Sequence, residues 1–302
     1  MIIYKNLNIK RNYKRAVIAI GNFDGLHLGH QKVLNQAKLK ARKENLKFGM
    51  VTFEPIPTMF FNKNIKHHRI NLITQKIYYL KKLKLDFLII IKFNKLFSNI
   101  NAGNFIKKIL VNKLKSKYIF VSRNFRFGKK RKGNIQTLKK LEKKFFYKTI
   151  ITPPYKKNNK IISSSLIRKN IAKGKVNKAQ TLLGRPWSIE GEVVRGQKRG
   201  RKIGFPTCNI KWNSYITPKL GVYAVNVEYK NLKKRGIANI GYRPTFNGKT
   251  LLLEVNIFGI KANLYKKIIR VGFTKFIRPE KKFKNISKLK KQIKKDIISA
   301  KK

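Results

Sequence analysis

Hydrophobic residues follow two alternating spacings over roughly the first 183 residues. Short apolar runs typical of buried strands are separated by segments whose apolar residues recur every three or four positions, as in amphipathic helices. The predicted strands are 16–20, 48–53, 87–93, 118–121 and 145–151, and the predicted helices are 30–44, 74–83, 105–114 and 135–144. This alternation predicts an α/β fold of the Rossmann-like kind, a parallel sheet with helices on both faces and a ligand site at the carboxyl edge of the strands.

Beyond residue 183 the helical spacing stops. Short runs rich in Val, Ile, Phe and Tyr lie between the turn-forming residues Gly, Pro and Asn. The predicted strands are 188–195, 207–210, 222–227, 236–240, 251–258 and 268–276, and segment 286–300 has apolar residues four apart. We therefore predict a small antiparallel β-barrel followed by a C-terminal amphipathic helix. The change of pattern divides the chain into domains 1–183 and 184–302.

Composition excludes several classes of protein. The N-terminal residues lack the apolar core of a signal peptide, and the longest apolar run, 87–91, is far too short to span a membrane. Cys208 is the single cysteine, so an internal disulfide is excluded. These features indicate a soluble, cytoplasmic protein, and they do not indicate an oligomeric state.

The chain carries 74 Lys and Arg residues against 11 Asp and Glu, a formal charge of +63. Such a balance by itself points to nucleic acid. The lysines, however, are spread over nearly every segment, which is typical of a Lys-, Ile- and Asn-rich composition rather than of a basic stripe. We expect nonspecific attraction to RNA at low salt and no specific nucleic-acid partner.

The stretch 16–34, AVIAIGNFDGLHLGHQKVL, places two histidines where a predicted strand leads into a predicted helix. His27 and His30 bracket Gly29 at this junction, where unpaired backbone N–H groups and the helix dipole favour an anion. We interpret the turn as a nucleotide-phosphate site with chemistry at phosphorus. A zinc site is disfavoured because no cysteine or third histidine lies nearby. His67 and His68, in a Lys-rich stretch, are expected to face solvent.

Several sequence blocks occur in one order along the whole chain. They are GNFDGLHLGH (21–30), FEPIP (53–57), NFRFG (124–128), SSSLIR (163–168), GRPWSIEGEVVRGQKRGRKIGFPTCNI (184–210), GVYAV (221–225), NIGYRPTFNG (239–248), LEVNIF (253–258) and FIRPEKKF (276–283). With these blocks the chain resembles the bacterial bifunctional riboflavin kinase/FMN adenylyltransferases, also called FAD synthetases. The resemblance implies that the second domain transfers the γ-phosphoryl group of ATP to riboflavin with Mg²⁺. It also implies that the first domain joins FMN to AMP, giving FAD and pyrophosphate.

In the first domain the resemblance implies catalytic, phosphate-binding roles for His27 and His30. It implies ATP or phosphate binding by further residues of the same blocks, namely Gly21, Phe23, Asp24, Gly29, Ser163, Ser164 and Arg168. Asn124 and Phe127 match the flavin side of the cleft. Two alternatives stay open: the serines are also typical of a helix N-cap, and Phe127 of core packing.

In the second domain, phosphoryl transfer to a hydroxyl calls for a general base, commonly a carboxylate. The only acid between Glu228 and Glu280 is Glu254, which matches the catalytic Glu of the family. Thr207 and Asn209 match a Pro-Thr-x-Asn block that holds Mg²⁺ through a hydroxyl and an amide oxygen. The alternative for Glu254 is a solvent-facing strand residue.

Two further sets of residues complete the predicted kinase site. Gly196, Gly200 and Gly204 are spaced so that a loop can wrap nucleotide phosphates through backbone N–H groups. Arg278 and Glu280 match a loop on the flavin side, although an exposed salt bridge would give the same residues.

Some positions depart from the family pattern, mostly in the first domain. Ser122 and Arg123 replace a Gly-acid pair, and the added Cβ at Ser122 is expected to strain a turn that needs positive φ. Met59, Ile161 and Ser165 also replace residues usual in the family. An alternative is therefore a riboflavin kinase with a decayed adenylyltransferase domain. A third hypothesis, from another class, is a basic RNA-binding protein that reuses a nucleotidyltransferase-like domain.

Overall fold

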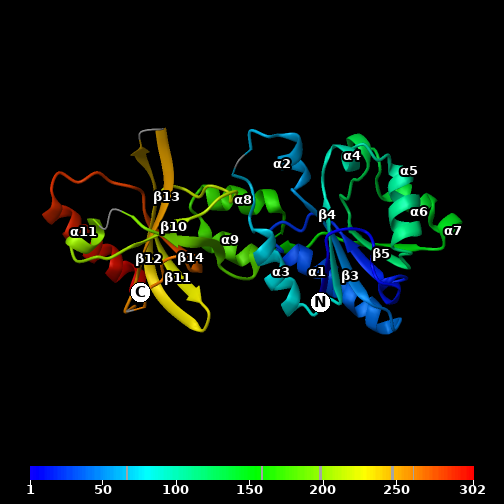
Figure 1. Cartoon of the computed structure of the whole chain (residues 1–302), viewed down its shortest axis with the longest axis horizontal. Coiled ribbons are helices and arrows are strands. Elements are labelled where there is room, and N and C mark those ends of the chain that lie inside the picture. Colours follow the sequence, from blue (N-terminus) through cyan, green and yellow to red (C-terminus); the bar gives the residue numbers. More distant parts are fainter. Residues whose placement is uncertain (66, 158, 197–198, 246–247, 261) are drawn as a thin grey trace. The chain divides into compact units, whose positions relative to one another are not determined.

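The computed structural model describes residues 1–65, 67–157, 159–196, 199–245, 248–260 and 262–302 (Figure 1). Its contacts divide the chain into two compact units. The first unit comprises Met1–Lys66 and Lys76–Ser163, and the second comprises His67–Gln75 and Ser164–Lys302. The assignment of the catalytic domains to 1–183 and 184–302 stays a prediction.

The first unit is built on a six-stranded sheet in the order β1-β4-β3-β2-β5-β6, in which every neighbouring pair is parallel. The strands are β1 (Ile2–Tyr4), β2 (Val17–Ile20), β3 (Phe48–Glu54), β4 (Phe87–Lys92), β5 (Tyr118–Ser122) and β6 (Lys148–Thr152). The predicted Rossmann-like α/β class is confirmed. Only β1 was not expected, because it is three residues long and carries no buried residue.

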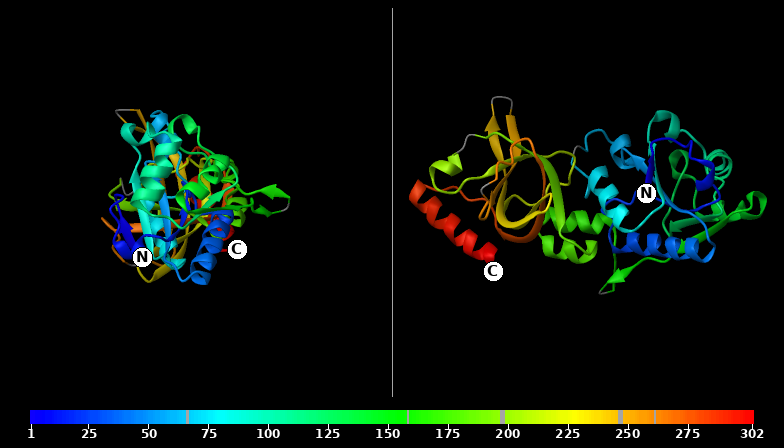
Figure 2. Two further views of the ribbon diagram at one scale, coloured as in Figure 1. Left: turned by 90° about the vertical axis from the view of Figure 1, so that its right-hand side faces the viewer. Right: turned by 60° about the horizontal axis from the view of Figure 1, so that its bottom comes forward.

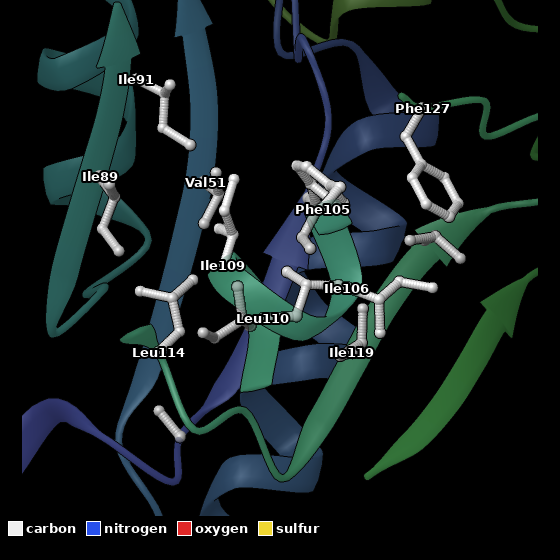
Figure 3. Packing of buried hydrophobic residues seen from close by; sticks show 14 of the residues in the cluster. Val51, Ile89, Ile91, Phe105, Ile106, Ile109, Leu110, Leu114, Ile119 and Phe127 are labelled. Atoms are coloured by element: carbon white, nitrogen blue, oxygen red, sulfur yellow. The ribbon is translucent and has the colours of Figure 1, made fainter. Parts of the chain in front are cut away.

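Helices cover both faces of this sheet because strand residues alternate between two apolar clusters. Val17 and Ala19 of β2 pack with the buried side of α1 (Leu28–Lys43), whereas Ile18 and Ile20 face the π-helical segment η2 (Phe105–Lys113). Figure 3 shows residues of η2 packed against side chains of β3, β4 and β5 in this second cluster. The remaining elements are η1 (Arg11–Tyr13), α2 (Pro57–Phe61), α3 (Ile73–Lys82), α4 (Lys95–Ser98), α5 (Ala102–Asn104), η3 (Lys129–Arg131), α6 (Ile135–Lys140), α7 (Glu142–Phe145), β7 (Lys156–Lys157) and β8 (Lys160–Ile161).

The prediction was wrong around residue 145. The expected helix 135–144 is broken into α6 and α7, and the expected strand begins at Lys148 instead of Phe145. Phe146 adopts a left-handed conformation (φ 54°) and is 90% exposed, so it ends α7 instead of starting a strand. An apolar run of aromatic residues does not distinguish these outcomes by periodicity alone.

The second unit contains a closed, antiparallel six-stranded barrel in the order β10-β13-β12-β11-β14-β9. Its strands are β9 (Trp187–Val194), β10 (Cys208–Lys211), β11 (Gly221–Tyr229), β12 (Leu232–Thr245), β13 (Gly248–Ile257) and β14 (Ile268–Arg278). The C-terminal helix α11 (Ile286–Lys301) packs on β11, β12 and β14, and Figure 2 shows it along the outside of the barrel. The predicted barrel and terminal helix are confirmed. The other helices of this unit are α8 (Ser164–Ala172), α9 (Val176–Leu183) and α10 (Arg199–Lys202).

A short segment from the first half of the chain, His67–Gln75, belongs to the barrel unit. The buried indole of Trp187 donates from Nε1 to the carbonyl of Ile70 (3.0 Å), and the amide of Gln75 donates to the carbonyl and hydroxyl of Ser188 (3.0 Å each). Arg69 forms a parallel bridge with Tyr215. The segment therefore contributes hydrogen bonds and buried surface to the barrel unit.

Among the described residues, no helix has the length and apolar character needed to cross a bilayer.

Candidate active sites

The histidine turn lies between β2 and α1 in the first unit, as predicted. The chain turns sharply there, with positive φ at Phe23 (47°), Gly25 (84°) and Leu26 (41°). His27 is the N-cap of α1, and its Nδ1 accepts the backbone N–H of His30 at 3.3 Å. Its imidazole therefore takes the place of the usual Ser or Asp cap and is fixed against the first turn of the helix.

The two imidazole rings stack, with centroids 3.6 Å apart and an interplanar angle of 17°. Because Nδ1 of His27 accepts a hydrogen bond, the neutral ring carries its proton on Nε2, which makes Nε2–H a donor. Gly29 packs closely against the ring of His27, since a Cβ there would lie 3.1 Å from Cε1 of His27 and would push that ring aside. The glycine thus permits the close packing that aligns both rings.

A buried lysine that sequence analysis did not select supports this turn. Lys76 of α3 is 2% exposed, and its Nζ donates to the carbonyl of Asn22 (2.7 Å) and to Oγ1 of Thr52 (3.1 Å). It therefore fixes the backbone of the turn at Asn22. The chain has many lysines, and nothing in the sequence around Lys76 distinguishes it from lysines that face solvent.

The other predicted residues of this site have different surroundings. The ring of Phe23 is buried in the apolar cluster of α1, so only its backbone is available to a ligand. Asp24 is buried as well (2% exposed). Ser163 ends the first unit, whereas Ser164 begins α8 and belongs with Arg168 to the second unit. Nε of Arg168 donates to the carbonyl of His68 (2.8 Å).

The two residues predicted on the flavin side differ in their placement. Asn124 is exposed and lines a cavity of about 770 Å³ in the first unit. Phe127 is 7% exposed, and its ring packs against Phe105 (centroids 5.2 Å apart) in the apolar cluster (Figure 3). This placement favours the core alternative for Phe127. Its flavin role stays a prediction.

The backbone at Ser122 differs from expectation. Ser122 is the last residue of β5 and is not among the residues with positive φ. The expected strain from its Cβ is therefore absent. The replacement of glycine at this position does not distort the end of β5.

In the second unit, strand register brings the predicted kinase residues together. Glu254 of β13 lies directly opposite Asn209 of β10 on one side and Asn239 of β12 on the other. Side chains directly opposite in an antiparallel pair project from the same face, about 5 Å apart at Cβ. The only acid between Glu228 and Glu280 therefore shares a face with the Pro-Thr-Cys-Asn turn.

The glycines and polar residues of the predicted nucleotide loop are also close together. A Cβ at Gly196 would fall 1.6 Å from Nδ2 of Asn209, and one at Gly200 would fall 2.4 Å from the carbonyl of Phe205 and 3.3 Å from Oγ1 of Thr207. Gly204 adopts φ of 89°. The loop therefore requires glycine at 196 and 200 to pack against the Thr-x-Asn turn, whereas at Gly204 it is the left-handed backbone that favours glycine.

Asn209 offers an oxygen to a ligand. Its Oδ1 is buried and has no hydrogen-bond partner among the described residues. The Thr207 hydroxyl is on an exposed residue of the same turn, and both are hard oxygen donors of the kind that Mg²⁺ prefers. Burial raises the pKa of the intervening Cys208 thiol, which therefore stays protonated at neutral pH and is unsuited to bind this ion.

Arg278 and Glu280 lie at the end of β14. The Arg278 guanidinium pairs with the buried carboxylate of Asp296 on α11, with Nη2 to Oδ2 at 2.8 Å. The Glu280 carboxylate lies against Gly241, where a Cβ would fall 1.7 Å from its Oε1. Since Gly241 is two residues after Asn239 in β12, Glu280 lies over the same barrel face as Glu254. The flavin-binding roles of both residues stay predictions.

One more candidate was missed in the sequence. Asn256 of β13 donates from Nδ2 to the carbonyl of Pro206 (2.6 Å) and so fixes the start of the Thr-x-Asn turn. Asn256 has no distinctive sequence pattern, although its i, i+2 spacing from Glu254 could have suggested a shared face.

Comparison with known proteins identifies the family. The family model for FAD synthetase matches residues 9–166, and the one for riboflavin kinase matches residues 183–302. A bifunctional riboflavin kinase/FMN adenylyltransferase of Buchnera aphidicola (subsp. Schizaphis graminum) is 43% identical over 98% of this chain and 96% of its own length. Relatives with the same name from Haemophilus influenzae and Escherichia coli K12 are 40% and 36% identical, over 97% and 94% of this chain and 96% and 91% of their own lengths.

A solved structure from Streptococcus pneumoniae, titled as a macrolide-efflux protein, has a TM-score of 0.88 and 31% identity and covers 99% of this chain and 98% of its own. Its title differs in kind from the names of the curated relatives, while its fold is the same. Both family models and the near full-length relatives point to one family. The chain therefore belongs to the bifunctional riboflavin kinase/FMN adenylyltransferase family and catalyses the synthesis of FMN and FAD.

Proposed function

We propose that the two reactions of this enzyme take place at the two sites described above. Adenylyl transfer is assigned to domain 1–183 with the histidine turn, and riboflavin phosphorylation to domain 184–302 with Glu254. The observation that carries the proposal is the register of β10 and β13, which sets Glu254 opposite Asn209 with its buried, unpartnered Oδ1.

In the adenylyl transfer, an oxygen of the FMN phosphate attacks the α-phosphorus of ATP, and the bond to the bridging oxygen breaks as pyrophosphate leaves. No strong base is needed because the attacking phosphate is already anionic. The site must instead offset repulsion between anions and stabilise the leaving group. Nε2–H of His27, the adjacent His30 and the N–H groups at the start of α1 supply donors for this purpose. Gly21, Asp24, Ser163, Ser164 and Arg168 are the further phosphate-side residues.

In the kinase reaction, the terminal ribityl hydroxyl of riboflavin attacks the γ-phosphorus of ATP, and ADP leaves. Glu254 accepts the proton of that hydroxyl as the new P–O bond forms. Gly196, Gly200 and Gly204 let the loop approach the phosphates through its backbone. Arg278 and Glu280 flank the flavin in this assignment.

Mg²⁺ fits the donors of the Pro-Thr-Cys-Asn turn, where Thr207 Oγ1 and Asn209 Oδ1 would hold it. Bound there, the ion would supply positive charge to the β- and γ-phosphates of ATP. The described residues contain no cluster of three or more His, Cys, Asp or Glu side chains suited to a metal.

We further propose that the enzyme acts in the cytoplasm, since both reactions consume ATP and a single cysteine leaves no internal disulfide. Its small-molecule substrates are riboflavin, FMN and ATP. Attraction to RNA is proposed to be nonspecific and lost as salt is raised.

The separation of the sites is tested with Glu254→Gln and His30→Ala. Purified protein is given ATP and Mg²⁺ with either riboflavin or FMN, and the flavins are separated by chromatography. Glu254→Gln should reduce FMN formation at least ~100-fold and leave FAD formation from FMN unchanged, whereas His30→Ala should do the reverse. The separate sites would be wrong if each variant lost both activities. FMN accumulation without FAD by the parent chain would instead select the kinase with a decayed adenylyltransferase domain.

A further inference from the structure

The cavity of about 770 Å³ in the first unit has an unusual lining. Three exposed arginines, Arg123, Arg126 and Arg131, lie around it together with the partly buried apolar side chains of Phe125 and Ile151. Arginine forks suit phosphate oxygens, and an aromatic and aliphatic surface suits a planar ring. The lining thus fits a ligand that combines a planar ring with a phosphate group.

All the charged side chains of this lining are positive. None of the described lining residues is acidic, and the three guanidinium groups make no hydrogen bond or ion pair with any described residue. An anion that binds in the cavity can therefore pair with these guanidinium groups without first displacing a carboxylate from them.

The loop that carries Arg131 is tied down by backbone hydrogen bonds. Phe127 and Gly133 exchange two backbone hydrogen bonds (3.1 and 2.9 Å), and the N–H of Lys129 donates to the carbonyl of Ile100 at 2.7 Å. Arg131 itself adopts a left-handed conformation (φ 57°). A loop fixed in this way loses little conformational entropy when it binds a ligand.

The cavity lies at the same edge of the sheet as the histidine turn. Asn124 and Arg123 directly follow β5, and β5 is the parallel neighbour of β2, whose carboxyl end leads into His27. Adjacent parallel strands present their carboxyl ends at one edge, so the cavity is next to the proposed adenylyl-transfer site.

We propose that Arg123, together with Arg126 and Arg131, makes this cavity selective for phosphorylated flavin over riboflavin. The inference rests on the proposed function of the first domain as the FMN adenylyltransferase. Riboflavin and FMN share the same ring and differ in the phosphate, and both occur together because the other domain converts one into the other. Only the charge of the phosphate can separate them, and three unpaired guanidinium groups recognise that charge. Arg123 is thereby a specificity-determining residue for FMN.

The test measures KM for FMN and the inhibition constant of riboflavin in FAD formation, for the parent and for Arg123→Asp. The charge reversal should raise KM for FMN about five- to tenfold and leave the riboflavin inhibition constant unchanged. Arg123→Gln should give an intermediate value. Because exposed charges are screened, the difference should shrink as salt is raised. Lys139→Asp is the matched control, since Lys139 is an exposed residue of α6 outside the cavity lining and should leave KM unchanged.

Three results would overturn the proposal. They are an unchanged KM for FMN in Arg123→Asp, an equal rise of KM and of the riboflavin inhibition constant, and a rise confined to KM for ATP. FMN and riboflavin binding, followed by flavin fluorescence in the same variants, needs no turnover. A parent chain that makes no FAD would therefore count against the proposed function, while the difference in FMN affinity would still decide the role of Arg123. If Arg123→Asp fails to fold, Arg123→Gln decides by the same criterion.

Discussion

At the scale of single residues, the kinase face depends on close contacts that only glycine allows. Asn209 lies so near Gly196 that any side chain at that position would displace its amide. The same amide carries the buried oxygen proposed to bind Mg²⁺. The block of glycines was visible in the sequence, but its spacing alone did not say which glycine touches which polar group.

Gly196→Ala should therefore impair phosphorylation of riboflavin. The added Cβ would fall 1.6 Å from Nδ2 of Asn209, so the amide must move, and we expect kcat/KM for FMN formation to fall at least ~10-fold. Gly272→Ala in β14 is the control, since its Cβ would lie at ordinary contact distance, 3.6 Å from its nearest neighbours. Full kinase activity in Gly196→Ala would contradict the proposed role of the Asn209 amide.

The histidine turn of the first unit likewise depends on the contacts of a single residue, the buried Lys76. Its ammonium group binds the turn that precedes His27 through the carbonyl of Asn22. One lysine among so many could not be selected from the sequence. Its role comes from burial, which is a property of the folded chain.

At the scale of elements, the ion pair between Arg278 and Asp296 joins α11 to the barrel. Asp296 is 3% exposed and receives hydrogen bonds from Nε of Arg278 (2.9 and 3.0 Å) and from Gln292 (2.8 Å). The amphipathic pattern of the sequence predicted this helix, but it did not indicate that an acidic residue would lie on the buried side of the helix. A buried carboxylate in a helix is stable only with such partners.

Asp296→Asn should destabilise the barrel unit by about 2 kcal/mol, because the partly buried Arg278 then lacks its counter-charge. Both tryptophans, Trp187 and Trp212, lie in this unit, so their fluorescence in a urea titration reports its unfolding. The double variant Asp296→Asn with Arg278→Met should recover part of the loss, since the unpaired charge is gone. Equal stability of Asp296→Asn and parent would show that the pair contributes nothing to the stability of the barrel unit.

At the scale of the whole molecule, the two compact units are not two contiguous halves of the sequence. Segment His67–Gln75 comes from the first half of the chain but packs with the barrel. Gln75 is fully buried, donates twice to Ser188, and accepts from the Tyr215 hydroxyl (2.9 Å) and the N–H of Leu72 (3.0 Å). The barrel unit therefore includes a polar network that its own contiguous sequence does not supply.

Gln75→Met should lower the stability of the barrel unit in the full chain. The substitution leaves the buried Tyr215 hydroxyl and Leu72 N–H without their acceptor, which we expect to cost about 2–3 kcal/mol. The measurement is again tryptophan fluorescence during urea unfolding. The exposed Thr74→Val variant, which loses only the hydrogen bond to Glu190 (2.9 Å), should cost under about 1 kcal/mol. A larger loss in Thr74→Val than in Gln75→Met would contradict this account of the network.

The sequence by itself determined the fold class, most of the strands and helices, and the identity of the chemistry-bearing blocks. It could do so because hydrophobic periodicity and turn residues are local properties, and because His27, His30 and Glu254 lie in short contiguous motifs. The error near Phe145 arose where an aromatic run suits a helix end as well as a strand.

Only the tertiary structure decided which residues meet. Strand register paired Asn209 with Glu254, burial distinguished Lys76 and Asp296 from other charged residues, and the loop closed between Phe127 and Gly133 brought Arg131 to the cavity that Arg123 also lines. The pairing of Asn209 with Glu254 joins positions far apart in the chain, the burial of Lys76 and Asp296 depends on exclusion of water, and the shared cavity depends on how the loop folds back. Local patterns carry no information on these properties, and so the surroundings of the sites had to come from the folded molecule.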